Sequence, residues 1–78
     1  MSYHIVFAPS RKHFLTHQRI KPEEFKTARY IPSPQFLYGI RDVKKITFIG
    51  SLPTKFMSDS HAHYWIQVWL KEAEVVYI

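Results

Sequence analysis

The most regular hydrophobic pattern in the chain lies in residues 60–74. Apolar residues recur there at intervals of three and four, as on one face of an amphipathic helix, at Ala62, Trp65, Ile66, Trp69, Leu70 and Ala73. A polar stripe occupies the opposite face, at Ser60, His63, Gln67, Lys71 and Glu74. Asp59 or Ser58 can cap the start of this helix. Tyr64 and Val68 widen the apolar face, which favours packing against the proline-rich segment over a partner surface.

Short apolar runs rich in β-branched and aromatic residues predict four strands. The first is Tyr3–Ala8, which Pro9 ends, and it is apolar on both faces as buried parallel strands are. The other predicted strands cover residues 29–31, 45–49 and 75–78.

Proline and serine positions predict shorter helical segments between the strands. Ser10 is expected to cap a helix over residues 11–18 with its hydroxyl. Pro22 suits the first position of a helical turn whose inner face carries Phe25 and Ala28. A compact helix is predicted over residues 33–39, whereas residues 54–59 are predicted to form a loop.

The alternation of strands and helices predicts a single α/β domain over residues 1–78. The sheet is expected to be small, four-stranded and mostly parallel, with the flavodoxin-like order 2-1-3-4. The early helices should cover one face and the tryptophan-rich helix the other.

Composition narrows the class of protein. The 78 residues include no cysteine, which excludes disulfides and thiolate chemistry. The longest apolar runs are far shorter than the roughly 18 residues of a membrane span. Residues 1–4 have no secretory-signal pattern. We therefore expect a soluble, cytoplasmic domain without membrane contact, in the host cytoplasm if the protein is viral.

Charge gives the first functional indication. The net charge is +5, and nine of the eleven cations lie in residues 1–45 with only three of the six acids. This asymmetry predicts a non-enzymatic protein that binds an acidic protein surface or nucleic acid, although a basic surface can also serve only solubility. The expected contact residues are Arg11, Lys12, Arg41, Lys44 and Lys45.

The predicted topology indicates an alternative, a phosphate-ligand or nucleotide-binding domain or enzyme. Ligands of open parallel sheets bind where the strand order reverses, here beyond the first and third strands. The loops at this point could bind an anion through Ser10, Arg11, Lys12, Ser51, Thr54 and Lys55. With only two glycines, the chain has no glycine-rich nucleotide motif.

Metal and catalytic motifs are weak. His13 and His17 have the i, i+4 spacing of zinc-binding pairs, but no third ligand accompanies them. We therefore predict solvated or packed histidines, and no metal or other cofactor. Ser58, Asp59, Ser60 and His61 are adjacent in sequence, whereas catalytic triads join distant elements.

Aromatic residues, 17% of the chain, leave single-stranded nucleic-acid binding open as a third hypothesis. The core requires Phe7, Phe48, Trp65 and Trp69. The candidates for exposed stacking are Phe14, Tyr38, Phe56 and Tyr64.

Residues 21–50 carry Arg29-Tyr30-Ile31, a serine-containing turn, Leu37-Tyr38-Gly39 and an apolar strand that ends at Gly50. This pattern resembles small proteins encoded by tailed bacteriophages, and the chain departs from it at Pro34 and Pro53. The resemblance implies a small α/β domain and a viral origin, and it implies no particular chemistry.

Overall fold

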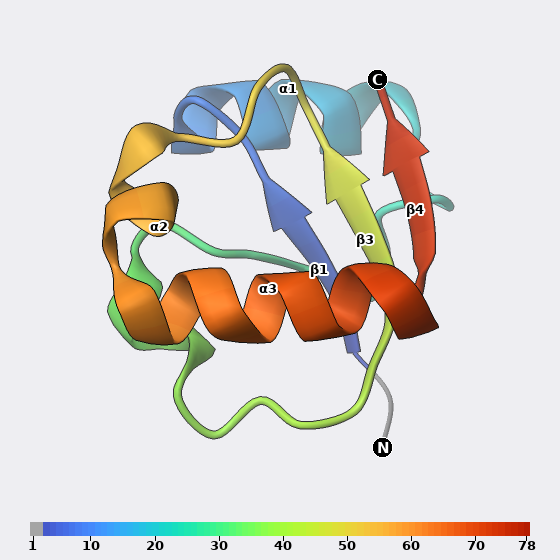
Figure 1. Ribbon diagram of the computed structural model, residues 1–78. Coiled ribbons are helices and arrows are strands. Elements are labelled where there is room, and N and C mark those ends of the chain that lie inside the picture. The colour runs from blue at the N-terminus through green and yellow to red at the C-terminus, as the bar shows by residue number, and fades with distance from the viewer. Residues whose placement is uncertain (1–2) are drawn as a thin grey trace.

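The computed structural model describes residues 3–78 and contains a four-stranded, fully parallel sheet in the order β2-β1-β3-β4 (Figure 1). The strands are β1 (Tyr3–Phe7), β2 (Ala28–Tyr30), β3 (Val43–Phe48) and β4 (Glu74–Tyr77). The predicted α/β class and the order 2-1-3-4 are therefore confirmed.

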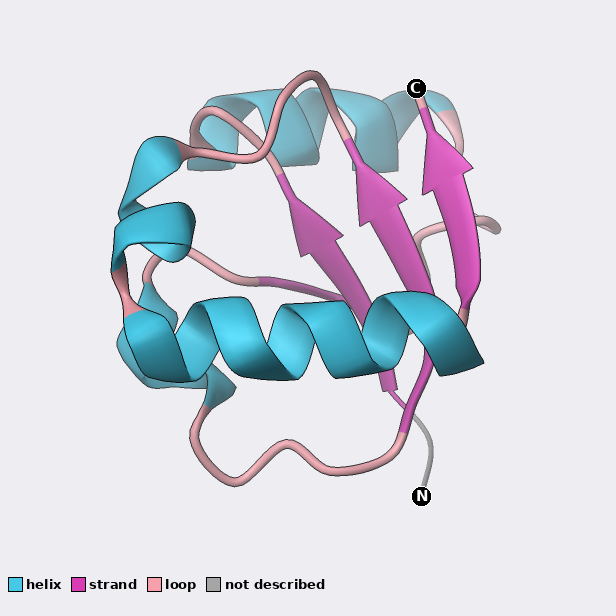
Figure 2. Cartoon of the chain, viewed as in Figure 1, coloured by secondary structure: helices cyan, strands magenta, loops and turns pink. Residues whose placement is uncertain are grey.

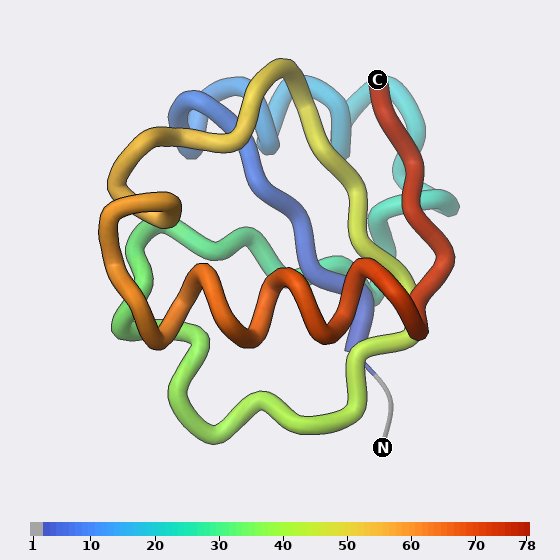
Figure 3. Tube along the Cα trace, viewed as in Figure 1, coloured from blue at the N-terminus to red at the C-terminus, as the bar shows by residue number. Residues whose placement is uncertain are grey.

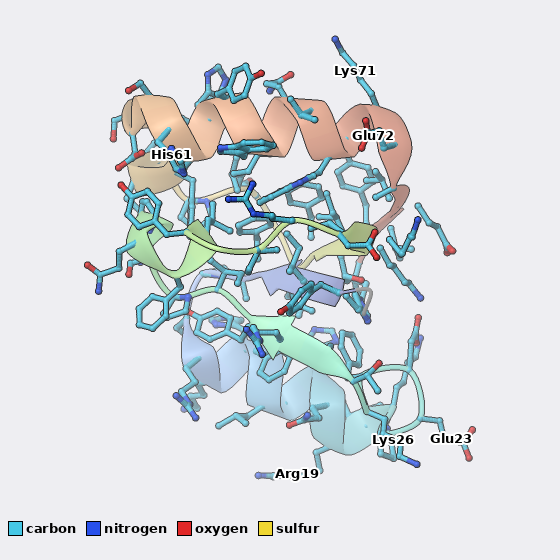
Figure 4. All side chains as sticks on the ribbon, turned by 90° about the horizontal axis from the view of Figure 1, so that it is seen from below. Arg19, Glu23, Lys26, His61, Lys71 and Glu72 are labelled. Atoms are coloured by element: carbon cyan, nitrogen blue, oxygen red, sulfur yellow. The ribbon has the colours of Figure 1, made fainter. Side chains whose placement is uncertain are left out.

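The helical segments form a layer on each side of the sheet (Figure 2). They are α1 (Arg11–Ile20), the 3₁₀ helix η1 (Pro34–Leu37), α2 (Thr54–Ser58) and α3 (Ser60–Glu72). In Figure 4 the sheet lies between the layers of α3 and α1. However, η1 packs on the face of α3 rather than beside α1, since Leu37 shares a core with Trp69. The reason is the direction of each connection: the chain moves to one side of the sheet from β1 to β2 and to the other side from β2 to β3. Because both connections are right-handed crossovers, their helices lie on opposite faces of the sheet.

Each face of the sheet has its own hydrophobic core. The larger core, under α3 and η1, includes Phe7, Phe48, Phe56 and Trp69. Phe7 stacks on Phe48 at 5.5 Å between ring centroids and meets Phe56 edge-on at 4.9 Å. The smaller core, under α1, consists of Val6, Ala8, Phe14, Phe25 and Ile49. The sheet is thus covered unequally, and the α1 side depends on few large side chains.

Local predictions at the helix ends had different outcomes. Asp59 caps α3 as expected, since its Oδ1 accepts a hydrogen bond from the Ala62 N–H at 2.9 Å. Ser10 precedes α1, but its side chain makes no capping bond, because its Oγ is hydrogen-bonded to His13 Nδ1 at 2.8 Å. The predicted loop over residues 54–59 was wrong, because Thr54–Ser58 is helical and buries Phe56.

Candidate functional site

The loops that follow β1 and β3 start at the same end of the sheet, where the strand order reverses (Figure 3). They border an open depression of about 470 Å³, lined by Pro9, Ser51, Leu52, Pro53, Thr54 and Lys55. The structure therefore brings together Ser51, Thr54 and Lys55, three of the six residues predicted to bind an anion.

The other three predicted anion-binding residues face different surroundings. Ser10 is hydrogen-bonded to His13, and Lys12 lines a separate hollow with His13, Thr16 and His17. Arg11 lines a third hollow, beside β2. The switch-point depression consequently has one lining cation, where the sequence suggested three.

The five cations predicted to contact a partner are divided between the two ends of the sheet. Arg11 and Lys12 follow the carboxyl end of β1, whereas Arg41, Lys44 and Lys45 lie just before β3 or at its start. Because β1 and β3 are parallel and Tyr3 is paired with Val43, these groups are separated by the length of a strand, about 16 Å. They cannot form one compact contact patch.

The structure instead places Arg11 on the same groove as Arg29, which the charge pattern did not single out. Both line a groove of about 420 Å³ together with Phe14, Tyr30, Pro32 and Phe36, which we call the arginine groove. None of its lining residues is acidic. Among residues 3–78 the salt bridges are Lys21–Glu24 and Lys44–Asp42, so neither arginine is neutralised by an ion pair.

Three elements build the arginine groove across the open edge of β2. Arg11 opens α1, and Phe14 lies one turn further along this helix. Consecutive strand residues point to opposite faces, so Tyr30 faces the α1 layer and Arg29 the η1 layer. Pro32 ends the strand, and Phe36 in η1 forms the far wall.

The interior of the groove is aromatic and its rim is charged. The rings of Phe14 and Tyr30 stack with their centroids 5.6 Å apart. The guanidinium carbon of Arg29 lies 5.0 Å from the centroid of the Tyr3 ring, which orients this cation. Phe36 is 51% exposed although it is large and apolar. The groove thus offers cations and an exposed aromatic ring to the same ligand.

A second aromatic cleft, of about 230 Å³, lies between α3 and the segment that precedes β3. Tyr38, Arg41, His61 and Trp65 are among its lining residues, and the ring centroids of Tyr38 and His61 are 4.4 Å apart. Figure 4 shows His61 at the start of α3. This contact explains why His61 lies beside the apolar face of the helix.

The predicted stacking residues divide into two exposed and two buried ones. Tyr38 and Tyr64 are exposed, as expected, whereas Phe14 and Phe56 are buried in the two cores. The prediction was wrong for Phe14 and Phe56 because both sit on the inner faces of helices, where a small domain uses every large apolar group.

The histidines and the Ser58–His61 set are not joined into a metal cluster in residues 3–78. His13 and His17 line a hollow whose other residues are Lys12 and Thr16, and no group of three potential metal ligands occurs in this part of the chain. The hydroxyl of Ser58 donates to the Thr54 carbonyl, and Asp59 caps α3. These side chains therefore have structural roles at helix ends.

His4 was not singled out by the sequence, and the fold gives it an unusual environment. Its side chain lies on the α1 side of β1, where Nε2 is 2.8 Å from Thr47 Oγ1 and the ring stacks on Phe25 at 6.1 Å. Burial lowers the pKa of His4 below its ordinary value of 6.5, and the charge of Lys45 adds to this effect, while Glu24 and Glu74 oppose it. The folded protein consequently favours the neutral imidazole.

This environment predicts that acid weakens the fold. Below pH 6.5 the unfolded chain takes up a proton at His4 more readily than the folded chain, so the free energy of unfolding decreases as pH falls. Well above that pH His4 is neutral in both the folded and the unfolded chain, so it no longer makes the free energy of unfolding depend on pH. Urea unfolding between about pH 7.5 and pH 5 measures the slope, which should be smaller in His4→Gln. A variant with the same slope as the wild type would contradict this role.

The comparisons with known proteins identify no relative of this chain. No protein-family description, no curated protein and no solved structure matches the chain significantly. The phage resemblance of residues 21–50 therefore stays a prediction. Within residues 3–78, the helices are too short or too polar to traverse a lipid bilayer.

Proposed function

We propose that this chain is a non-enzymatic binding protein that engages an acidic macromolecular partner through its basic N-terminal half. The observation that carries the proposal is that Arg11 and Arg29 line one groove that has no lining acid. Two cations without an acidic neighbour give this surface a positive potential, which attracts an anionic partner.

The start of α1 supports the same proposal. The first turn of a helix carries a partial positive charge and is stabilised by acidic side chains. In α1 this turn has no acid and instead begins with Arg11 and Lys12. This arrangement costs local stability, and a bound anion would offset the cost, which favours a binding role for these cations.

The resemblance of residues 21–50 to proteins of tailed bacteriophages extends the proposal to a viral origin. A phage-encoded protein meets its partners in the bacterial cytoplasm. The relevant acidic partners are then bacterial proteins and nucleic acids.

Capture from a bacterial lysate, with and without nuclease, tests the proposal. We expect the wild-type chain to retain an acidic protein or nucleic acid, and the capture to decrease steeply with added salt. The double variant Arg11→Glu/Arg29→Glu should lose it. The matched control Lys26→Glu/Lys71→Glu changes the same charge at two exposed cations outside the arginine groove and the switch-point depression, and it should retain the partner.

A further variant distinguishes the two ends of the sheet. Lys44→Glu/Lys45→Glu alters the cations at the start of β3, where Lys44 is already paired with Asp42 at 3.5 Å. Capture that survives this change but not the loss of Arg11 and Arg29 assigns the contact to the arginine groove. Salt-insensitive capture by all variants would contradict an electrostatic partner.

A phosphate ligand at the switch-point depression is the second candidate. It is favoured by Ser51, Thr54 and Lys55, which line one hollow where parallel sheets bind ligands. A ligand that binds only the native state raises the melting temperature, so a thermal-shift screen with nucleotides and sugar phosphates tests it. The Lys55→Gln variant should lose any shift, and a screen without a shift removes this candidate.

A further inference from the structure

We infer that the arginine groove binds single-stranded nucleic acid, with a base stacked on Phe36 and the neighbouring phosphates held by Arg11 and Arg29. This inference rests on the proposed function and narrows its partner to one chemical class. It assigns a role to the exposed aromatic ring that charge alone leaves unexplained.

Phe36 has the properties of a stacking platform. Its side chain is 51% exposed and belongs to neither hydrophobic core, whereas the next residue, Leu37, is buried and anchors η1. Covering an exposed aromatic ring with a planar base removes apolar surface from water. Because every base has a π face, such a contact tolerates any sequence.

The two arginines line the same groove as this ring and come from different elements. Arg11 approaches the groove from α1 and Arg29 from β2, so phosphates can be contacted from two elements. The planar guanidinium group binds phosphate with two parallel hydrogen bonds. The contact between Arg29 and the Tyr3 ring restrains this side chain before binding, which reduces the entropy lost on association.

The combination favours a single strand over the two other anionic partners. A duplex keeps its bases stacked inside and presents phosphates and groove edges, so no base face is available to Phe36. An acidic protein can neutralise both arginines through carboxylates, but it covers Phe36 only if an aromatic side chain happens to lie beside its acids. Every nucleotide of an unpaired strand carries both a phosphate for the arginines and a base for the ring.

Fluorescence anisotropy with labelled ten-nucleotide strands of oligo-dT and oligo-U, and with a duplex of equal length, tests the inference on the full chain. Both single strands should bind more tightly than the duplex. Phe36→Ala should weaken single-strand binding by about 5- to 150-fold without changing its salt dependence. Arg11→Gln and Arg29→Gln should each reduce the slope of log affinity against log salt by about 0.7.

Two controls carry matched changes away from the groove. Tyr64→Ala removes an aromatic ring that is 62% exposed on α3, and Lys71→Gln removes an exposed cation at the far end of this helix (Figure 4). Both should bind like the wild type. Circular dichroism spectra of all variants should match, since every substituted side chain is exposed.

Three results would overturn the inference: no binding of either strand, a duplex that binds equally well, or unchanged binding by Phe36→Ala. The lysate experiment then separates it from the proposed function. Nuclease-resistant capture of an acidic protein that requires Arg11 and Arg29 would leave the proposed function standing with a protein partner. The absence of both oligonucleotide binding and lysate capture would refute both.

Discussion

We expect Trp69→Ala to lose a large part of the protein's free energy of unfolding. Trp69 is 1% exposed and packs between α3 and the sheet, with its ring stacked on Trp65 at 5.9 Å. Truncating a buried tryptophan costs about 3–5 kcal/mol through lost burial and the cavity left behind. A 78-residue chain has a total stability of roughly 4–12 kcal/mol, so the loss consumes a large part of it.

Thermal and urea unfolding followed by circular dichroism measure this effect. For a domain of this size the melting temperature should fall by about 12–40 °C. Tyr64→Ala provides the control, because it truncates an aromatic side chain of the same helix on its exposed side. This control should stay within about 0.5 kcal/mol of the wild type. Equal losses in the two variants would contradict the docking of α3 through its Trp69 face.

The large helix and the strand order could be predicted because their signals are repeated along the chain. In α3, apolar residues at intervals of three and four cover more than two turns, and Ala62, Ile66 and Trp69 are indeed buried. Four separate apolar runs joined by helical segments leave few topologies for a small parallel sheet. Because several residues carry the same signal, a wrong expectation at one residue does not change the predicted helix or strand order.

The short helix α2 escaped prediction because it depends on contacts between distant residues. The five residues of α2 contain one large buried side chain, Phe56, and one residue defines no period. Its edge-on contact with Phe7, 49 positions earlier, helps to hold this helix against the sheet. The missing cap at Ser10 has a local origin, since its hydroxyl is hydrogen-bonded to the His13 side chain, three residues along the chain, instead of a backbone N–H.

The candidate site could not be predicted because sequence proximity is a poor guide to charge clusters in a parallel sheet. Arg11 and Lys12 seemed to join Arg41, Lys44 and Lys45 in one basic half, yet the strands carry the two groups to opposite ends. The arginine groove joins residues from α1, β2 and η1 across an edge that only the folded chain has. In the sequence, the groove was indicated only by the neighbouring positions of Arg29 and Tyr30.

Because the core beneath α1 is the smaller of the two, we expect Phe25→Ala to cause the second large loss of stability. Phe25 is 0% exposed and is the largest fully buried side chain of the core beneath α1. Its ring meets Phe14 edge-on at 6.2 Å, and its carbonyl accepts a hydrogen bond from the Gln18 amide at 3.4 Å. The substitution should cost about 3–5 kcal/mol and loosen α1 from the sheet.

Hydrogen exchange distinguishes this loss from that of Trp69. Because Phe25 supports only the α1 side, amides of α1 should lose protection in Phe25→Ala at denaturant concentrations where those of α3 remain protected. Phe36→Ala is the matched control, since it truncates a phenylalanine that is half exposed, and its stability should stay near that of the wild type. Uniform loss of protection in Phe25→Ala would instead show that the two cores unfold as one unit.

The same variant also affects the proposed binding site. The arginine groove includes Arg11 and Phe14 of α1, so a loosened α1 also removes one wall of this site. Phe25→Ala should therefore weaken oligonucleotide binding through the fold, whereas Phe36→Ala weakens it with the fold intact.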